Sequence, residues 1–230
     1  MFMNKGLGLR MSLVAILSIT VLVLSCSQLS PSSTPAPPPN TQELTPGQSI
    51  PSETQATPTS TDLSSLVRSD PAKVDNSKLP ITPIEQIHIT GSSPEIDIAK
   101  YRLVVDGLVD TPISLTYEAI MQYPTVTEVV LLICPYTFVD NAQWTGVPVA
   151  TILAEVGVQP QASEVTFYAA DQFQYNKTLP LVEAQHDGVF LAHTVDGQIL
   201  PKEHGYPLRL VVKGEYGSYW VKWVNHIEIE

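Results

Sequence analysis

The chain has 230 residues and a formal net charge of −11 at pH 7, from 12 Lys and Arg against 23 Asp and Glu. This acidic balance argues against a nucleic-acid partner, because the binding of phosphates requires concentrated Lys and Arg. The chain has two cysteines, Cys26 and Cys134, so an intrachain disulfide can form only if both remain free.

The N-terminal segment has the features of an export signal. Lys5 and Arg10 form a short positive region before an apolar run at residues 11–24. The run has the length of a signal-peptide core and is shorter than the roughly 20 residues that a membrane span requires. The run ends in a small residue followed by Cys26, which resembles the bacterial lipoprotein cleavage box. We therefore predict a signal peptide at residues 1–25 and lipidation of Cys26. The alternative is an ordinary secretory signal in which Cys26 has no role.

Residues 26–76 are rich in Ser, Thr, Pro, Gln and Asn. Such a composition contains too little apolar side chain to offset the entropy of ordering, so we expect a disordered, partly extended tether. Lipid on Cys26 would hold the protein to the membrane in the cell envelope, on the extracytoplasmic side, without embedding it. Cys134 would then be a lone thiol in an oxidising compartment, which is a hazard unless the thiol is buried or bound.

Residues 77–230 have the length of one domain with its own core. Apolar runs and β-branched residues predict strands at residues 101–109, 126–134, 165–170, 189–193, 208–212 and 219–229. Helical spacing predicts short helices at residues 114–122, beginning at Ser114 or Thr116, and at 147–156, with Gly157 as the C-terminal cap. Strands predominate and do not alternate with helices, so we predict the α+β class.

Four segments of this domain resemble successive signatures of one family. They are Trp-Thr-Gly-Val-Pro at 144–148, Leu-Ala-His-Thr-Val-Asp-Gly at 191–197, His-Gly-Tyr-Pro-Leu-Arg-Leu at 204–210 and Tyr-Gly-Ser-Tyr-Trp-Val-Lys-Trp-Val at 216–224. Their order and spacing are similar to those of the sulfite oxidase type of molybdopterin-dependent oxidoreductase, which includes the catalytic subunits of periplasmic methionine sulfoxide reductases. The resemblance covers residues 101–229 and implies a molybdopterin-binding domain of mixed, mostly β sheets with a few short helices.

The resemblance also implies the residues of the site. Cys134 would be the catalytic thiolate ligand in a molybdenum–molybdopterin cofactor, and a soft thiolate suits a transition metal already held by dithiolene sulfurs. The other cofactor-binding positions would be His204, Arg209, the backbone of Trp220 and Val221, and Lys222 at the phosphate end. The alternatives are that Cys134 is a small buried hydrophobe and that Arg209 and Lys222 are solvated strand ends.

Some segments depart from the family pattern. Residues 77–230 contain only two arginines, Arg102 and Arg209, which argues against sulfite as the substrate because sulfite-oxidising members surround the anion with several arginines. His-Ile-Thr-Gly at 88–91 replaces a family segment that contains an asparagine, and Asp-Gln-Phe at 171–173 replaces an Asp-Gly-Tyr that is frequent in the family. The chain has no Cys-x-x-Cys-His haem motif, so electrons would be exchanged with a separate partner.

Two functions remain open. The first is an oxidoreductase that moves an oxygen atom to or from a small-molecule donor or acceptor, with a haem or quinone redox partner. The second is a non-catalytic binding or scaffold lipoprotein that kept the fold without the cofactor. Residues 4–10 lack the arginine pair that exported, cofactor-loaded members tend to carry, which favours the second. A copper or zinc site with Cys134 and a histidine has no supporting ligand spacing.

Overall fold

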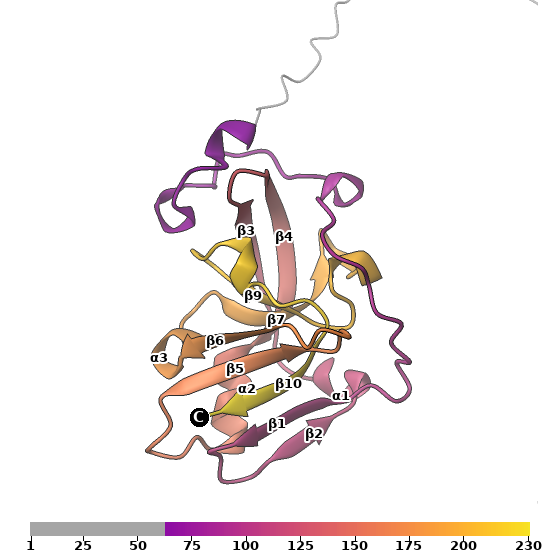
Figure 1. The fold of residues 1–230 in the computed structure, drawn as a ribbon, viewed down its shortest axis with the longest axis vertical. Coiled ribbons are helices and arrows are strands. Elements are labelled where there is room, and N and C mark those ends of the chain that lie inside the picture. The colour runs from indigo at the N-terminus through magenta and orange to yellow at the C-terminus, as the bar shows by residue number, and fades with distance from the viewer. Residues whose placement is uncertain (1–62) are drawn as a thin grey trace, which may run out of the picture. The chain divides into compact units, whose positions relative to one another are not determined.

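A computed structural model gives the fold and describes residues 63–230 (Figure 1). The predicted signal peptide, Cys26 and most of the predicted tether lie outside the described residues. Among the helices of residues 63–230, none is long and apolar enough to cross a membrane.

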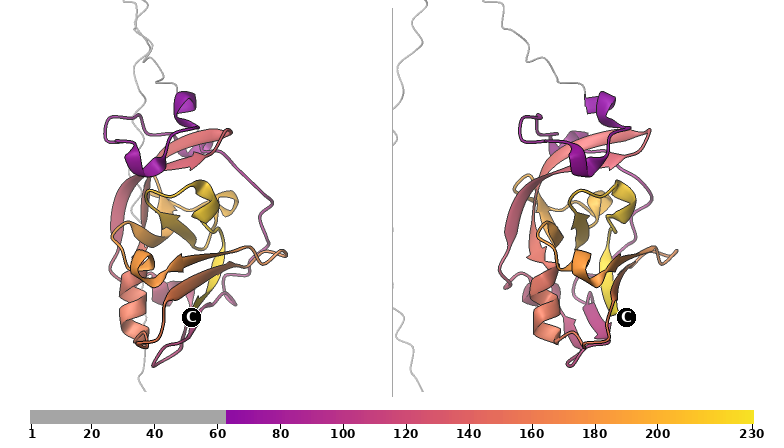
Figure 2. Two further views of the ribbon diagram at one scale, coloured as in Figure 1. Left: turned by 60° about the vertical axis from the view of Figure 1, so that its left-hand side comes forward. Right: turned by 90° about the vertical axis from the view of Figure 1, so that its left-hand side faces the viewer.

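Two five-stranded sheets form the domain (Figures 1 and 2). The first has the order β2-β1-β10-β5-β6, and its strands are β1 (Leu103–Gly107), β2 (Ile113–Leu115), β5 (Glu164–Ala169), β6 (Asn176–Pro180) and β10 (Val224–Ile229). The second contains β3 (Val126–Cys134), β4 (Phe138–Pro148), β7 (Val189–Val195), β8 (Gln198–Ile199) and β9 (Arg209–Val212), with β9 paired to β7. β1 and β10 are parallel and the other pairs antiparallel.

Short helices connect these strands, namely α1 (Tyr117–Ile120), α2 (Val149–Val156) and α3 (Leu181–Ala184). Five 3-10 turns are also present among the described residues: η1 (Leu63–Leu66), η2 (Pro71–Lys73), η3 (Ile84–Gln86), η4 (Lys202–His204) and η5 (Gly217–Tyr219). The mostly-β arrangement with few short helices confirms the predicted α+β class.

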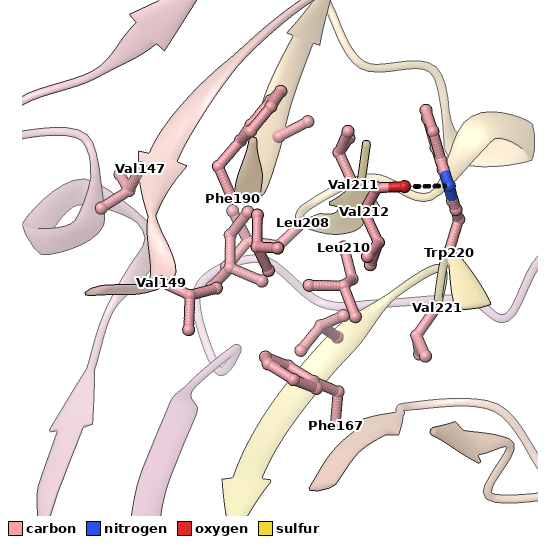
Figure 3. Packing of buried hydrophobic residues seen from close by; sticks show 14 of the residues in the cluster. Val147, Val149, Phe167, Phe190, Leu208, Leu210, Val211, Val212, Trp220 and Val221 are labelled. Atoms are coloured by element: carbon pink, nitrogen blue, oxygen red, sulfur yellow. Dashed lines mark hydrogen bonds between the residues drawn. The ribbon is translucent and has the colours of Figure 1, made fainter. Parts of the chain in front are cut away.

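The core lies between the two sheets and α2. Figure 3 shows Phe190, Leu208 and Leu210 near Val149 of α2 and Phe167 of β5, and all five side chains are fully buried. Each contributes about 1.5–3 kcal/mol by leaving water. α2 buries the four apolar residues that repeat at helical spacing, Val149, Ile152, Leu153 and Val156.

The helix termini follow from local signals. α1 begins after Thr116, whose hydroxyl accepts a hydrogen bond from the amide of Ala119 at 3.2 Å, as an N-cap does. The residues just before it form β2, so the helix is shorter than the predicted 114–122. α2 ends at Gly157, whose φ of +66° is the left-handed conformation expected of a C-terminal glycine. Of the two predicted starts, Ser114 lies in β2 and Thr116 is the N-cap, and the predicted C-terminal cap at Gly157 is confirmed.

Periodicity alone does not reveal β4, which is the longest described strand and contains the buried polar residues Asp140 and Asn141. Asn141 is satisfied by chain far upstream: its side-chain amide donates to the carbonyls of Leu79 and Pro80, each at 3.3 Å. Its side-chain oxygen accepts from Asn76 at 2.9 Å. Burial of these polar groups is tolerated because each finds a partner. The predicted strand at 219–229 is also shorter, because η5 and an irregular stretch precede β10.

The N-terminal segment (residues 63–79) packs against the β3–β4 hairpin (Figure 1). Leu63, Leu66 and Val67 contact the hairpin, and the carbonyl of Val67 accepts a hydrogen bond from the amide of Tyr136 at 3.0 Å. The packed domain therefore includes residues 63–76, which composition assigned to the tether. The predicted domain start at residue 77 is corrected on this point. Leu63, Leu66, Val67 and Val74 give the otherwise polar segment an apolar side that packs on the hairpin.

Gly146 lies where β4 and β7 approach each other closely, at the register shift between Thr145 and Gly146. A Cβ at Gly146 would lie 2.1 Å from the carbonyl oxygen of Leu191, so backbone would have to move. We expect Gly146→Ala to lower the free energy of unfolding by about 3 kcal/mol in urea titrations. Gly197→Ala is the control, since a Cβ there meets nothing within 4 Å and adds only the strain of its φ of +75°, about 1 kcal/mol. Equal losses for the two variants would contradict the close approach.

Candidate functional site

A cavity of about 540 Å³ lies beside the end of β3, the loop at 88–91, the β5–β6 connection and the segment before β10. It brings together four of the predicted site residues, Cys134, Arg209, Trp220 and Lys222. The cavity is lined by Thr90, Gly91, Leu132, Cys134, Pro135, Phe138, Ala169, Asp171, Phe173, Tyr175, Arg209, Gly217, Ser218, Trp220, Lys222 and Trp223. The other two predicted residues, His204 and Val221, do not line it.

Cys134 is the last residue of β3 and a free, half-buried thiol. The amide of Thr137 donates to the carbonyl of Cys134 at 3.0 Å and closes a tight turn, in which Pro135 is followed by Tyr136 with a φ of +63°. Because side chains alternate along a strand, Leu132 and Cys134 share one face, and both line the cavity. The thiol is therefore placed on the wall of a cavity and not sealed within the core.

Arg209, the first residue of β9, is a buried cation with only 5% of its surface exposed. Its guanidinium carbon lies 5.1 Å from the ring centre of Trp144 and 5.6 Å from that of Trp220, and one terminal nitrogen donates to the carbonyl of His204 at 3.0 Å. Its Nε has no hydrogen-bond partner among the described residues. Burial lowers the pKa of Arg209 to about 10, and the charge of Asp140 partly opposes this shift.

Lys222 lies near Arg209 and is half-buried. Its Nζ donates to the carbonyls of Glu203, at 2.9 Å, and of Thr90, and lies 4.7 Å from the ring centre of Trp223. Burial and then the charge of Arg209 lower the pKa of Lys222 to about 8, with a smaller opposing effect of Glu203. The hydrogen bond from Lys222 to the carbonyl of Thr90 joins the loop at 88–91 to the site. This contact uses the backbone of the loop, so it forms although the sequence of the loop departs from the family pattern.

Gly205, which follows η4, allows the two cations to lie near each other. Its φ is +116°, and a Cβ there would lie 3.1 Å from the Cβ of Arg209 and 3.2 Å from that of Lys222. Within residues 63–230, neither cation forms an ion pair with a carboxylate. The site therefore holds two neighbouring positive charges, neither of which is in direct contact with a carboxylate of the described residues.

His204 and Trp220 hold Arg209 in place through buried contacts. His204 is buried, its carbonyl holds Arg209, and its Nδ1 has no partner among the described residues. Burial lowers the pKa of His204, and the charges of Arg209 and Lys222 lower it further. Trp220 is fixed by its indole N–H, which donates to the carbonyl of Val212 at 3.1 Å (Figure 3).

The backbone amides of Trp220 and Val221 were expected as cofactor donors, but they donate within the chain. Their partners are the carbonyls of Gly217, at 3.2 Å, and Tyr219, at 3.1 Å. Trp220 still contributes its side chain to the cavity wall, whereas Val221 is fully buried in the core.

Two aromatic residues at the cavity, Phe173 and Tyr175, carry no signal in the sequence beyond the departure at 171–173. Phe173 is 79% exposed and Tyr175 42% exposed. The carboxylate of Asp171 accepts the amides of both, at 3.1 and 3.0 Å, and the hydroxyl of Tyr175 donates to the carbonyl of Ser218 at 2.6 Å. A short turn organised by Asp171 therefore presents two rings at the cavity.

The donor set fits a group that brings its own metal ligands and an anionic end. Within residues 63–230, no three His, Cys, Asp or Glu side chains lie close enough to hold a metal ion, and this part of the chain offers one cysteine sulfur, that of Cys134. The unpaired Nε of Arg209 and the neighbouring Lys222 match a phosphate, which both side chains bind through charge-assisted hydrogen bonds. Molybdopterin has these two features, since its dithiolene holds the metal and its side chain ends in a phosphate.

Comparisons with known proteins agree with this chemistry. Residues 90–230 match the family described as "Oxidoreductase molybdopterin binding domain". The chain is 33% identical over 131 residues to the putative protein-methionine-sulfoxide reductase subunit YedZ1 of Azospira oryzae, covering 57% of this chain and 49% of that protein. It is 36% identical over 98 residues to the mitochondrial sulfite oxidase of Drosophila melanogaster, covering 40% of this chain and 17% of that protein.

The fold is also similar to a solved structure, the sulfane dehydrogenase SoxCD from Paracoccus pantotrophus. The TM-score is 0.57 at 27% sequence identity, and the match covers 80% of this chain and 55% of that one. The chain spans at most about half the length of the curated relatives cited above. A family match over more than half of the chain nevertheless identifies its domain: the chain belongs to the molybdopterin-binding oxidoreductases of the sulfite oxidase and methionine sulfoxide reductase type.

Proposed function

We propose that this protein is a molybdenum-cofactor oxidoreductase that transfers an oxygen atom to or from a small molecule. The observation that carries the proposal is the presence in one cavity of a free thiol, Cys134, and two unpaired cations, Arg209 and Lys222. The cysteine sulfur would match the metal of the cofactor, and the two neighbouring cations would match its phosphate.

An anion bound at the site would stabilise the charged form of each cation. Burial lowers the pKa of Arg209 and of Lys222, and the charge of Arg209 lowers the pKa of Lys222 further. A phosphate beside them would raise both pKa values and offset the cost of burying the charges. The Nε of Arg209 supplies a donor for this phosphate, and His204 Nδ1 is a further buried group that has no partner within residues 63–230. When bound, the cofactor supplies two-electron oxygen-atom transfer. The protein binds and orients the cofactor and the substrate, and it excludes water from the site.

The cavity favours a neutral substrate over sulfite. Phe138, Phe173 and Tyr175 give it aromatic walls, and the carboxylate of Asp171 would repel an anion. The two cations in its lining are directed to backbone carbonyls and to the proposed phosphate, which leaves no free cation in the lining for a substrate anion.

Electrons would be exchanged with a separate haem or quinone partner. Relatives of this chain are named as subunits, which supports a multi-protein system. Lipid on Cys26, after a signal peptide at 1–25, would keep the enzyme in the cell envelope at the extracytoplasmic membrane surface, where a membrane-bound partner is accessible. These assignments are supported by the N-terminal sequence.

A binding or scaffold lipoprotein without the cofactor is the alternative, and the missing arginine pair in residues 4–10 favours it. Metal and pterin analysis of the mature protein, purified from its native envelope, separates the two functions. A stoichiometric content of molybdenum and pterin supports the enzyme, and protein without either supports the alternative.

Cys134→Ala tests the thiolate ligand. Protein made in a molybdenum-competent host should contain about one molybdenum per chain, and the variant should lose its oxidoreductase activity because the metal loses its only protein sulfur. Elemental analysis and activity assays measure both, and thermal unfolding serves as the control for folding. Full metal content together with full activity in Cys134→Ala would refute the assignment.

Arg209→Lys tests the phosphate site, because lysine keeps the charge but loses the planar fork of donors and the close contact of the guanidinium with Trp144 and Trp220. We expect retention of pterin, measured by fluorescence after its release from purified protein, to fall at least about tenfold. Arg102→Lys is the matched control, since Arg102 is exposed and lies outside the cavity. Equal retention by both variants would place the phosphate elsewhere.

Phe173→Ala tests the aromatic wall. With an aryl sulfoxide as a neutral substrate, kcat/KM should fall about tenfold, which corresponds to the loss of about 1.4 kcal/mol of apolar contact. Sulfite should be at least about 100-fold poorer than this substrate in the unmodified enzyme, because it lacks charge partners. Val182→Ala is the control, as Val182 is 75% exposed on α3. Efficient sulfite oxidation would contradict the proposed preference.

A further inference from the structure

We propose that Tyr175 is a specificity-determining residue of this cavity, and that the hydrogen bond from its hydroxyl to the backbone of Ser218 fixes the width of the entrance. The inference rests on the proposed oxygen-transfer function and deepens it, because an entrance of fixed width restricts the neutral substrate to slender molecules. Asp171 is the positioning residue of the turn that carries the ring.

The residues that line the cavity differ in their exposure, which distinguishes its base from its entrance. Leu132, Arg209 and Trp220 are buried and form the base. Cys134 is half-buried on the wall. A substrate that comes from solvent to this wall therefore passes the exposed lining residues, which form the entrance, namely Thr90, Gly91, Phe173, Tyr175 and Ser218.

The turn that carries the two aromatic rings of the entrance is held by Asp171. One carboxylate oxygen accepts the amides of Phe173, at 3.1 Å, and of Tyr175, at 3.0 Å. The carbonyl of Asp171 accepts the amide of Gln174 at 3.2 Å, and Gln174 has a φ of +49°, in the left-handed region. Side-chain acceptors of this kind replace regular backbone pairing in turns. The backbone that bears the two rings is therefore fixed by one side chain.

The hydroxyl of Tyr175 joins this turn to a distant part of the chain. It donates to the carbonyl of Ser218 in η5, 43 residues further along, at 2.6 Å. A second contact links the same two regions, since Nζ of Lys177 in β6 lies 5.1 Å from the ring centre of Tyr219 in η5. Burial raises the pKa of Tyr175, so its hydroxyl stays protonated and keeps donating at neutral pH. The two sides of the entrance are therefore connected.

The 3-10 turn η5 lies directly on the strand that ends in Cys134. A Cβ at Gly217, the first residue of η5, would lie 3.0 Å from a side-chain carbon of Leu132 and 3.4 Å from the carbonyl oxygen of Ile133. The glycine thus permits η5 to approach β3 closely, one or two residues before Cys134. Because the hydroxyl of Tyr175 is bound to η5 and η5 packs on β3, the ring is fixed relative to the thiol.

An entrance fixed in this way selects substrates by shape. Aromatic rings form favourable contacts with apolar groups and with sulfur, so a slender sulfoxide is stabilised by Phe173 and Tyr175 as it enters. A branched substituent needs a wider entrance, which requires the loss of the hydrogen bond between Tyr175 and Ser218. One hydrogen bond between uncharged groups changes an equilibrium by about three- to tenfold, so the discrimination that depends on it has about this size.

The test compares two neutral sulfoxides on molybdenum-loaded enzyme. Methyl phenyl sulfoxide and tert-butyl phenyl sulfoxide differ only in the bulk of one substituent, and the unmodified enzyme should prefer the methyl compound at least about tenfold in kcat/KM. Tyr175→Phe keeps the ring and loses the hydroxyl, so this preference should fall about fivefold. Tyr168→Phe is the matched control, because it removes from β5 a hydroxyl that donates to Glu228 at 2.8 Å and lies outside the cavity lining. Its preference should equal that of the unmodified enzyme.

Asp171→Ala tests the positioning role, since the amides of Phe173 and Tyr175 then lose their acceptor. The preference for the methyl compound should fall in this variant as well. Hydrogen exchange of the full chain gives a readout that does not need the cofactor: both amides should exchange at least about fivefold faster in Asp171→Ala and in Tyr175→Phe than in the unmodified chain.

An unchanged preference in Tyr175→Phe overturns the inference. An equal fall of kcat/KM for both sulfoxides also leaves the preference unchanged, and it assigns the hydroxyl a structural role alone. Both outcomes leave the proposed function standing. Absence of molybdenum from the unmodified protein, together with no activity on either sulfoxide, overturns the proposed function and this inference with it.

Discussion

The burial of an unpaired guanidinium is the constraint on which the arrangement of this domain depends. Arg209 leaves water almost completely, and an isolated buried charge costs several kcal/mol unless partners replace its hydration. Two indoles, from β4 and from the segment before β10, lie within 5.1 and 5.6 Å of its guanidinium carbon, and a carbonyl from η4 accepts one of its hydrogen bonds. Segments far apart in sequence are thereby joined at one cation, which leaves a donor for a ligand.

Much of this organisation can be predicted from local sequence. Continuous apolar runs give β3 and β9, and Thr116 and Gly157 mark helix ends through side-chain capping and a left-handed glycine. Arg209 and Lys222 can also be predicted from the sequence, because they lie in two segments that resemble family motifs, and the same resemblance implies Cys134. All three residues line one cavity.

The rest depends on contacts between distant residues. β4 is hidden because Asp140 and Asn141 interrupt its apolar pattern, and their partners lie more than 50 residues upstream. The packing of residues 63–76 depends on the surface that the β3–β4 hairpin presents, which composition does not describe. Phe173 and Tyr175 have no periodicity, and they reach the cavity because Asp171 folds a turn beneath them.

The attachment of the N-terminal segment has a mechanical consequence. The carbonyl of Val67 bonds to the amide of Tyr136, two residues after Cys134, and Arg68 lies 5.4 Å from the ring centre of Tyr136. A pulling force applied upstream of Leu63 is transmitted to the β3–β4 hairpin, which includes this turn. Because the turn bears the thiol, tension along the chain would act on the geometry of Cys134 directly, and the contacts of Leu63, Leu66 and Val67 with the hairpin distribute that load over a wider surface.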